Sequence, residues 1–259
     1  MAIITLTTDL GDKDFYQAAL KGSILSQLPN ANIVDITHDI AAFNIPQAAF
    51  VLKNSFHYFP KNTVHLIGID SVFNKNTRYI ALKYKEHYFI GADNGIFSLL
   101  FDEEPSEIVE LNIMQDLKFL HFPLSDIFPK AASHLAKGGK LKDIGLPVNN
   151  VEQRMTLQPV IEESIIRGSV IYIDSFQNVI TNITKELFTK FQRNRDFTLF
   201  FRRNESISQL SWHYNEVEEG EKLCLFGISN HLEIAINKGN ASGLLGLNLG
   251  DIVRIEFHP

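Results

Sequence analysis

An abrupt change from apolar to acidic residues near the N-terminus constrains this chain most. The run that starts at Ile4 ends in Asp9, Asp12 and Asp14, which surround Gly11, and a helix-like pattern follows at once. In a parallel sheet, the carboxyl end of a strand is where ligands are held. Three carboxylates at that place suit a cationic or hydroxyl-rich ligand and repel free phosphate. The segment therefore argues against nucleotide-phosphate binding.

Composition narrows the classes of partner. The 259 residues are 45% hydrophobic, enough for a sizeable core, and the net charge is −6. A negative chain does not suit a nucleic-acid backbone. No window approaches the roughly 18–20 apolar residues of a membrane span, and no secretory signal is visible. We therefore expect a cytoplasmic protein that binds neither nucleic acid nor membrane, with the lone Cys224 as a buried core thiol.

The texture of the sequence divides the chain into two domains. Strand-like and helix-like stretches alternate first, which predicts an α/β domain with a mainly parallel sheet over residues 1–158. Short β-type runs with polar turns follow, which predict a small all-β barrel over residues 159–259. Residues 153–163 are the expected linker. The expected strands cover residues 2–7, 32–36, 64–69, 79–84, 88–91 and 107–111, then 165–173, 179–183, 197–201, 222–228, 232–236 and 251–257.

Capping residues predict where the helices begin. Asp14 is placed to cap a helix after the first strand. Pro46 suits the first turn of a second helix. A third helix is expected over residues 126–136, with Ser125 or Asp126 as its cap and a glycine pair after its end.

Polar residues at strand ends are candidates for ligand contacts in the first domain. Asp9 could accept hydrogen bonds from both hydroxyls of a ribose, although a solvated turn explains it as well. Asp70 follows a strongly apolar strand and could meet the ligand, with Arg78 tuning its pKa. The alternative for these two is an ordinary loop with a surface ion pair of little value. Asn94 could read a ligand from a segment that also makes a simple turn.

In the second domain, the segment after Asp174 is the main candidate. Phe176 could stack on a planar ring, and Asn178 could read the polar edge of that ring. A hairpin corner is the alternative, because Asp, Ser and Asn favour turns. The histidines show no metal-binding spacing, and no phosphate-binding glycine loop or serine elbow is present.

Six segments in order resemble the S-adenosylmethionine hydroxide adenosyltransferase family, also called SAM hydrolases, which is related to the fluorinases and chlorinases. They include TTDLG at 7–11, DITHDI at 35–40, DNG at 93–95, YIDSFQNVITNI at 172–183 and LEIA at 232–235, together with the helix at 126–136. The resemblance covers nearly the whole chain. It implies an α/β domain and a β-barrel assembled as a homotrimer, with ligand sites between subunits.

The same resemblance implies roles for individual residues. Asp9 would hold the ribose hydroxyls, Asp174 would meet the ammonium group of the methionine part, and Phe176 and Asn178 would contact adenine. S-adenosylmethionine would be the substrate or ligand, with no cofactor and no metal. Further substrate contacts are expected at Asp14, Phe43, Asn94, Phe122, Ser229 and Glu233.

The chain departs from the family at the catalytic positions. Hydrolytic members use an Asp–Arg–His set to activate water. Here Asp70 is kept, but Thr77 falls at the arginine position and Pro123 at the histidine position. Arg78 could reach inward from its loop. His121 could replace residue 123, because residues two apart on an extended segment share a face.

Two functions stay open at this stage. Water could attack the ribose C5′ of S-adenosylmethionine and release adenosine and methionine, with Asp70, Arg78 and His121 as the catalytic residues. Alternatively, the chain is a non-catalytic binder of adenosine or S-adenosylmethionine. Attack by a halide is disfavoured, because Asp70 would set a negative charge beside an incoming anion.

Overall fold

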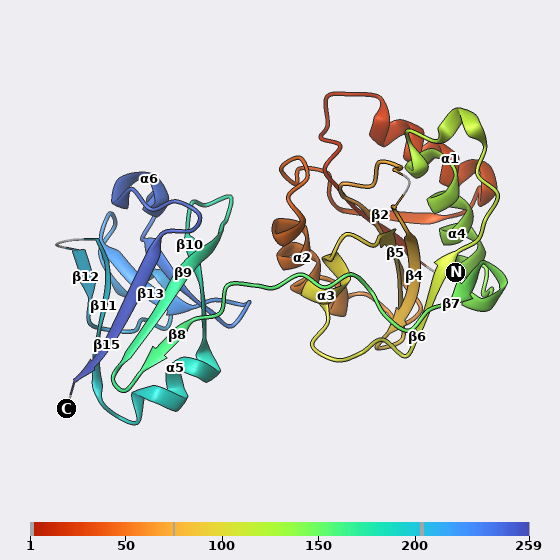
Figure 1. Ribbon diagram of the computed structural model, residues 1–259. Helices are drawn as coiled ribbons and strands as arrows, with labels where there is room; N and C mark the ends of the chain where they lie inside the picture. Colours follow the sequence, from red (N-terminus) through yellow and green to blue (C-terminus); the bar gives the residue numbers. More distant parts are fainter. Residues whose placement is uncertain (1–2, 75, 203–204, 259) are drawn as a thin grey trace. The chain divides into compact units, whose positions relative to one another are not determined.

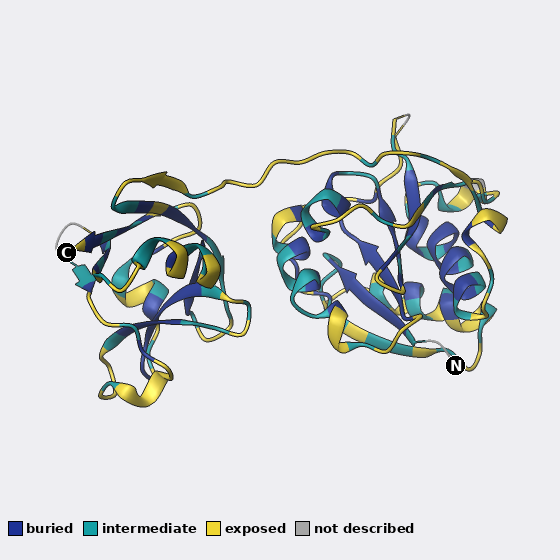
Figure 2. Ribbon diagram, turned by 90° about the horizontal axis from the view of Figure 1, so that it is seen from below, coloured by how far each residue is buried: buried dark blue, intermediate teal, exposed yellow. Residues whose placement is uncertain are grey.

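The chain folds into two compact units, Met1–Met155 and Thr156–Pro259. The computed structural model describes residues 3–74, 76–202 and 205–258 (Figure 1). Residues 152–158 are exposed and form the yellow connecting segment of Figure 2. The predicted linker was too long at its C-terminal end, because residues 160–162 form a strand that pairs with its neighbour. We therefore describe each unit by itself.

In its described residues, the first unit contains a seven-stranded sheet in the order β2-β1-β3-β5-β4-β6-β7. The block β2-β1-β3-β5 is parallel, and the remaining pairings are antiparallel. The α/β prediction is thereby confirmed, because apolar runs alternate with helices along this part of the chain. The strands are β1 (Ile3–Thr8), β2 (Asn32–Thr37), β3 (Val64–Gly68), β4 (Tyr79–Tyr84), β5 (His87–Ala92), β6 (Glu107–Leu111) and β7 (Gly145–Pro147).

Helices cover both faces of this sheet (Figure 1). The helices α1 (Tyr16–Gln27) and α4 (Ile127–Ala136) pack on one face, where Leu20 and Phe128 share a core with Leu6 and Leu66. The helices α2 (Ile45–Lys53) and α3 (Ile96–Leu100) pack on the other face. Figure 2 shows the central strands of this unit in dark blue between the two helical layers. Buried sheet faces leave the strand ends as the part of the sheet that loops can turn into a site.

Two of the capping predictions were wrong. Helix α1 begins at Tyr16, and its cap is the backbone of Phe15, so Asp14 makes no capping bond. Asp126 occupies the cap position of α4, but its carboxylate instead accepts from the Asp116 N–H and pairs with Lys130. Side-chain caps need an extended backbone before the helix, and Phe15 is already helical. Pro46 does lie in the first turn of α2, as predicted.

Every pairing among the described strands of the second unit is antiparallel. Their order is β12-β11-β15-β9-β10-β14-β13, with β8 on β9, and a bridge between Leu210 and Cys224 nearly closes the sheet into a barrel. The Cys224 thiol is buried, as predicted, and burial raises its pKa to about 12. The strands are β8 (Val160–Glu162), β9 (Ile165–Ile173), β10 (Val179–Thr184), β11 (Asp196–Arg202), β12 (Glu205–Ile207), β13 (Lys222–Phe226), β14 (His231–Ile236) and β15 (Ile252–His258).

Two helices complete the second unit. The helix α5 (Lys185–Gln192) places Phe188 in the barrel core, where its ring contacts Phe197, Phe226 and Phe257. The short helix α6 (Ala241–Leu245) is capped by the Asn240 side chain. None of the helices in the described ranges is both long and apolar enough to cross a membrane. The cytoplasmic location stays a prediction.

Candidate functional site

The carboxyl edge of β1, β3 and β5 brings together four of the predicted site residues. The Asp9 Oδ2 atom accepts hydrogen bonds from the Phe43 N–H at 2.9 Å and the Asp70 N–H at 3.4 Å. The Asn94 amide donates to the carbonyl of Ile69 at 2.9 Å and to that of Asp70 at 3.4 Å. The parallel strands end at one edge, so residues far apart in the sequence meet there.

Backbone strain accompanies this cluster. Phe43 and Asp70 have φ angles of 63° and 43°, in the left-handed region that non-glycine residues rarely adopt. These are the same two residues whose N–H groups reach Asp9. Strain of this kind costs about 1–3 kcal/mol per residue and tends to persist at ligand sites. The strained backbone thus supports a role for this edge beyond that of an ordinary loop.

The Arg78 side chain is bound to a different carboxylate than predicted. Its guanidinium pairs with Asp93, whose side chain is 1% exposed. The other Asp93 oxygen accepts from the Glu152 N–H at 2.7 Å. In the ranges that the structure describes, no ion pair joins Arg78 to Asp70. Arg78 therefore neutralises a buried carboxylate, and the geometry gives no direct support to its predicted action on Asp70.

The segment around His121 is not extended, so the argument that residues 121 and 123 share a face was wrong. His121 lies in an exposed turn, and Pro123 begins a 3-10 helix over Pro123–Ser125. Pro123 fixes its own φ, which suits that helical start. The ring of Phe122 is partly buried, 5.3 Å from that of Tyr16. Asp14 is exposed and lies before the start of α1.

In the second unit, Asp174 and Asn178 hold the turn between β9 and β10. The Asp174 carboxylate accepts from the Asn178 N–H at 2.8 Å and from the Asn178 amide at 3.0 Å. Phe176, at the tip, is 80% exposed. The hairpin-corner interpretation is therefore correct. It also leaves an unpacked aromatic ring beside a polar turn, which is the arrangement that stacking on a base requires.

Asp174, Phe176, Asn178 and Glu233 form the second cluster of predicted site residues. Glu233 is its more buried acid. It is 7% exposed, and its Oε2 accepts from the Tyr214 hydroxyl at 2.8 Å. Burial raises the pKa of Glu233, and the nearby Asp174 charge adds to this, against the hydrogen bond from Tyr214. Burial and the Glu233 contact likewise raise the pKa of Tyr214. A buried charge needs such a partner.

Ser229 is the remaining predicted site residue of the second unit. The Ser229 hydroxyl is buried with no hydrogen-bond partner among the described residues. Sequence analysis missed Tyr214, which lies in a short 3-10 turn that carries no motif. Within the described ranges, no group of three or more histidine, cysteine and acidic side chains is arranged to hold a metal ion.

Comparisons with known proteins agree with the resemblance of the six segments. The family model of the SAM hydroxide adenosyltransferase N-terminal domain matches residues 4–145, and that of the C-terminal domain matches residues 168–254. A protein named (R)-S-adenosyl-L-methionine hydrolase from Methanocaldococcus jannaschii is 31% identical, over 98% of this chain and 96% of its own. One of the same name from Thermus thermophilus is 27% identical, over 98% of this chain and 100% of its own.

A solved structure extends the similarity to three dimensions. An uncharacterized conserved protein from Thermotoga maritima superposes with a TM-score of 0.88 at 31% identity, over 98% of this chain and 99% of that one. Both domain models and the full-length relatives therefore lead to the same conclusion: the chain belongs to the SAM hydroxide adenosyltransferase family.

Proposed function

We propose that this protein is an S-adenosylmethionine hydrolase that releases adenosine and L-methionine. The observation that carries the proposal is the meeting of Asp9 and Asp70 at one sheet edge, in a chain of this family. The full-length relatives named (R)-S-adenosyl-L-methionine hydrolase support it. A carboxylate suits both hydroxyls of a ribose, and a second carboxylate beside it suits the polarisation of water.

The proposed reaction needs little acid catalysis. Water attacks the ribose C5′, the C5′–O bond forms, and the C5′–S bond breaks. The sulfonium sulfur takes the bonding electron pair and leaves as the neutral thioether of methionine, so no proton has to reach the leaving group. The water loses one proton, and the exposed Asp70 carboxylate is its nearest proposed acceptor. The rate would then depend on positioning and desolvating the nucleophile.

The second cluster would hold the rest of the substrate. Asp174 would pair with the ammonium group of the methionine part, Phe176 would stack on adenine, and Asn178 would read its polar edge. The exposed Phe176 ring supports this assignment. Further contacts proposed from the resemblance are those of Asp14, Phe43, Asn94, Phe122, Ser229 and Glu233.

A non-catalytic binder is the second candidate. The pairing of Arg78 with Asp93 and the proline at position 123 favour it, because another carboxylate binds Arg78 and the family's histidine position holds no imidazole. In the hydrolase proposal, the exposed turn of His121 brings its imidazole to the attacking water.

Release of adenosine separates the two candidates. Purified protein is incubated with each sulfonium epimer of S-adenosylmethionine, because the relatives are named for the (R) epimer. We expect adenosine and methionine in equal amounts, and a loss of rate of about 100-fold or more for Asp70→Asn. Asp12→Asn is the matched control, since Asp12 is exposed and binds only Gln17 among the described residues. Adenosine binding without turnover would establish the binder instead.

The assembly is also a proposal. The family resemblance suggests a homotrimer with sites that use residues of neighbouring subunits. Mass photometry at assay concentration tests this, and a monomer that is fully active would contradict it. No nucleic acid or cofactor is needed for the proposed reaction.

A further inference from the structure

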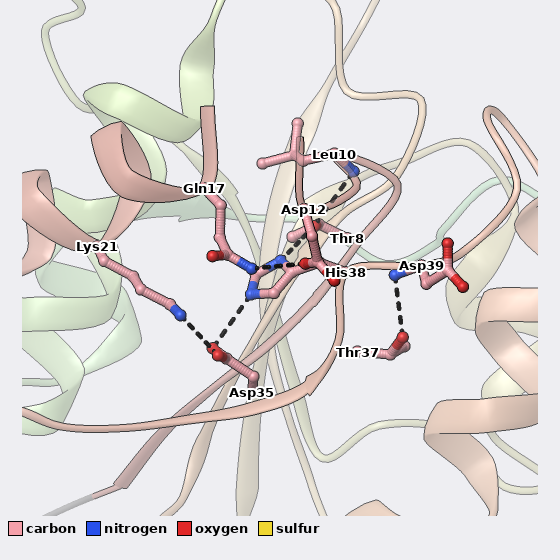
Figure 3. Close-up of polar contacts among 9 residues, drawn as sticks. All are labelled: Thr8, Leu10, Asp12, Gln17, Lys21, Asp35, Thr37, His38 and Asp39. Atoms are coloured by element: carbon pink, nitrogen blue, oxygen red, sulfur yellow. Dashed lines mark hydrogen bonds and ion pairs between the residues drawn. The ribbon is translucent and has the colours of Figure 1, made fainter. Parts of the chain in front are cut away.

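A polar network runs from Thr8, which precedes Asp9 in the chain, through His38 to Asp35 and Lys21 (Figure 3). The Thr8 Oγ1 atom is 2.7 Å from His38 Nδ1, and His38 Nε2 is 3.1 Å from Asp35 Oδ1. Lys21 Nζ is 2.6 Å from Asp35 Oδ2. Thr8 and His38 are 0% and 5% exposed. The network therefore links the core of the sheet to helix α1 through one imidazole ring.

For a neutral His38 ring, the charge of Asp35 favours one tautomer. An ionised carboxylate only accepts, so the His38 nitrogen that faces Asp35 carries the proton. Its other nitrogen, Nδ1, then accepts from the Thr8 hydroxyl. The Thr8 oxygen accepts in turn from the Leu10 N–H at 3.4 Å. The Thr8–His38 contact is a hydrogen bond and holds the ring against the hydroxyl, whereas His38 Nε2 approaches Asp35 only at ion-pair distance and has no hydrogen-bond partner among the described residues.

The order hydroxyl, imidazole, carboxylate is that of a nucleophilic triad, but this hydroxyl cannot act as a nucleophile. The Thr8 side chain is 0% exposed, so no substrate atom can reach its oxygen. A nucleophile must come within hydrogen-bond distance of the reacting group. The network must therefore serve some other purpose than covalent catalysis.

What the network holds in place is the backbone on both sides of Asp9. The Leu10 N–H is bonded to the Thr8 hydroxyl, and the Gly11 N–H donates to the His38 carbonyl at 2.8 Å. The Ile40 N–H donates to the Thr8 carbonyl at 3.4 Å. Asp9 lies between these anchored residues and projects its carboxylate to the Phe43 and Asp70 N–H groups.

We propose that His38 is a positioning residue, which fixes the turn Thr8–Gly11 and thereby aims the Asp9 carboxylate at ligand hydroxyls. This inference rests on the proposed function, since it takes a ribose-bearing ligand at Asp9 as given. A displacement of about 1 Å in such a group is enough to cost on the order of 100-fold in efficiency. Loss of the network should therefore weaken ligand binding by more than the accompanying loss of folding stability can explain.

The same strand offers a matched control. Thr5 of β1 bonds to the buried His65 with the same 2.7 Å separation between Oγ1 and Nδ1. Thr5 and His65 are both 0% exposed, and neither is adjacent to Asp9. The substitutions Thr8→Val and Thr5→Val therefore each remove a threonine–histidine bond from the same strand, with almost no change in side-chain shape. Thr8→Val also removes the acceptor of the longer Leu10 bond.

Calorimetry with adenosine and steady-state kinetics with S-adenosylmethionine, alongside melting temperatures, test the proposal. We expect both valine variants to melt at lower temperature, but only Thr8→Val to raise the Kd for adenosine, by about 10- to 100-fold. KM should rise more than kcat falls, because a grip on the ribose acts on ground state and transition state alike. His38→Ala should behave as Thr8→Val does, and His38→Asn should recover part of the affinity, since its amide can partner the Thr8 hydroxyl.

Equal effects of Thr8→Val and Thr5→Val on the adenosine Kd would overturn the positioning role, as would unchanged binding by a folded Thr8→Val. Asp9→Asn separates this failure from failure of the proposed function. If Asp9→Asn leaves the adenosine Kd unchanged, the ribose contact itself is wrong. If Asp9→Asn weakens binding and Thr8→Val does not, only the role of His38 is wrong.

Discussion

Among the described residues, the first unit buries three histidines, two of which contact each other, whereas the second unit buries a glutamate. His65 Nε2 lies 3.1 Å from His87 Nδ1, and burial, together with the His87 charge, lowers the pKa of His65 to about 3. Burial also lowers the pKa of His87. In the second unit, burial raises the pKa of Glu233. Burial disfavours the charged form in each case, but a base and an acid then respond to pH in opposite directions.

This difference predicts the direction of pH change that destabilises each unit. Below about pH 6.5 the unfolded chain protonates His65 while the folded chain does not, so the first unit loses stability as the pH falls toward 3. Above about pH 4.5, Glu233 ionises in the unfolded chain, but its raised pKa keeps it protonated to higher pH in the folded chain. The second unit therefore loses stability as the pH rises.

The largest effect is expected from filling the space beside Glu233. A Cβ atom on Gly227 would overlap the Glu233 carboxylate. Gly227→Ala should therefore destabilise the protein by about 3 kcal/mol, because neither the barrel backbone nor the buried acid can move freely. Denaturant unfolding measures this. Gly22→Ala in α1 is the control, since a Cβ there meets open space, and it should be neutral or stabilising. An equally stable Gly227→Ala would show that Glu233 is not fixed in its pocket.

Loss of the partner of Glu233 should have the next largest effect. Tyr214→Phe removes the hydrogen bond to a buried carboxylate, at an expected cost of about 1–3 kcal/mol near neutral pH. The bond favours the ionised form, so the pKa of Glu233 should rise further, and the loss should be smaller at acid pH than at alkaline pH. Thermal melts across this range check the sign. Tyr58→Phe, at an exposed tyrosine, is the control.

The opposed pH responses can be measured in one chain by hydrogen exchange with peptide resolution. Between about pH 6.5 and 4.5, peptides from β3 and β5 should lose protection by up to about 1.4 kcal/mol per pH unit for one proton. Peptides from β13 and β14 should instead lose protection as the pH rises from about 5. His65→Asn should flatten the acid response of the first unit. If both units lost protection in the same direction of pH change, the proposed opposite pH responses would be wrong.

The smallest stability effect is expected at the carboxylate with the largest proposed role in binding. Asp9→Asn keeps an oxygen that can accept the Phe43 and Asp70 N–H groups, so its folding free energy should change by less than about 1 kcal/mol. Its affinity for adenosine should nevertheless fall, since an amide accepts more weakly than a carboxylate. A destabilisation comparable to that of Gly227→Ala would mean that Asp9 is structural.

Much of the fold could be predicted because apolar runs mark strands without reference to distant residues. The strands at 79–84, 107–111 and 165–173 agree with the structure at both ends. The rule that ligands collect at strand carboxyl ends placed Asp9 and Asp70 at the sheet edge where they meet in the structure. Short elements such as β7, β12 and α6 were missed, because three to five residues carry too little periodicity.

What could not be predicted depends on side chains that meet across the fold. Tyr214 reaches Glu233 from a turn without any sequence signal, and Arg78 selects Asp93 over Asp70 because the buried carboxylate needs a cation. The argument from spacing for His121 failed because Pro123 starts a 3-10 helix where an extended segment was assumed. Spacing arguments hold only while the local backbone geometry is known.

Isotope labelling tests the central claim most directly. The protein is incubated with S-adenosylmethionine in water enriched in the heavy isotope of oxygen, and the products are analysed by mass spectrometry. The proposed attack on C5′ predicts adenosine that carries one heavy oxygen in its 5′-hydroxyl, with unlabelled methionine. Absence of adenosine, or adenosine without the label, would contradict water attack at C5′ and with it the function proposed for the Asp9–Asp70 edge.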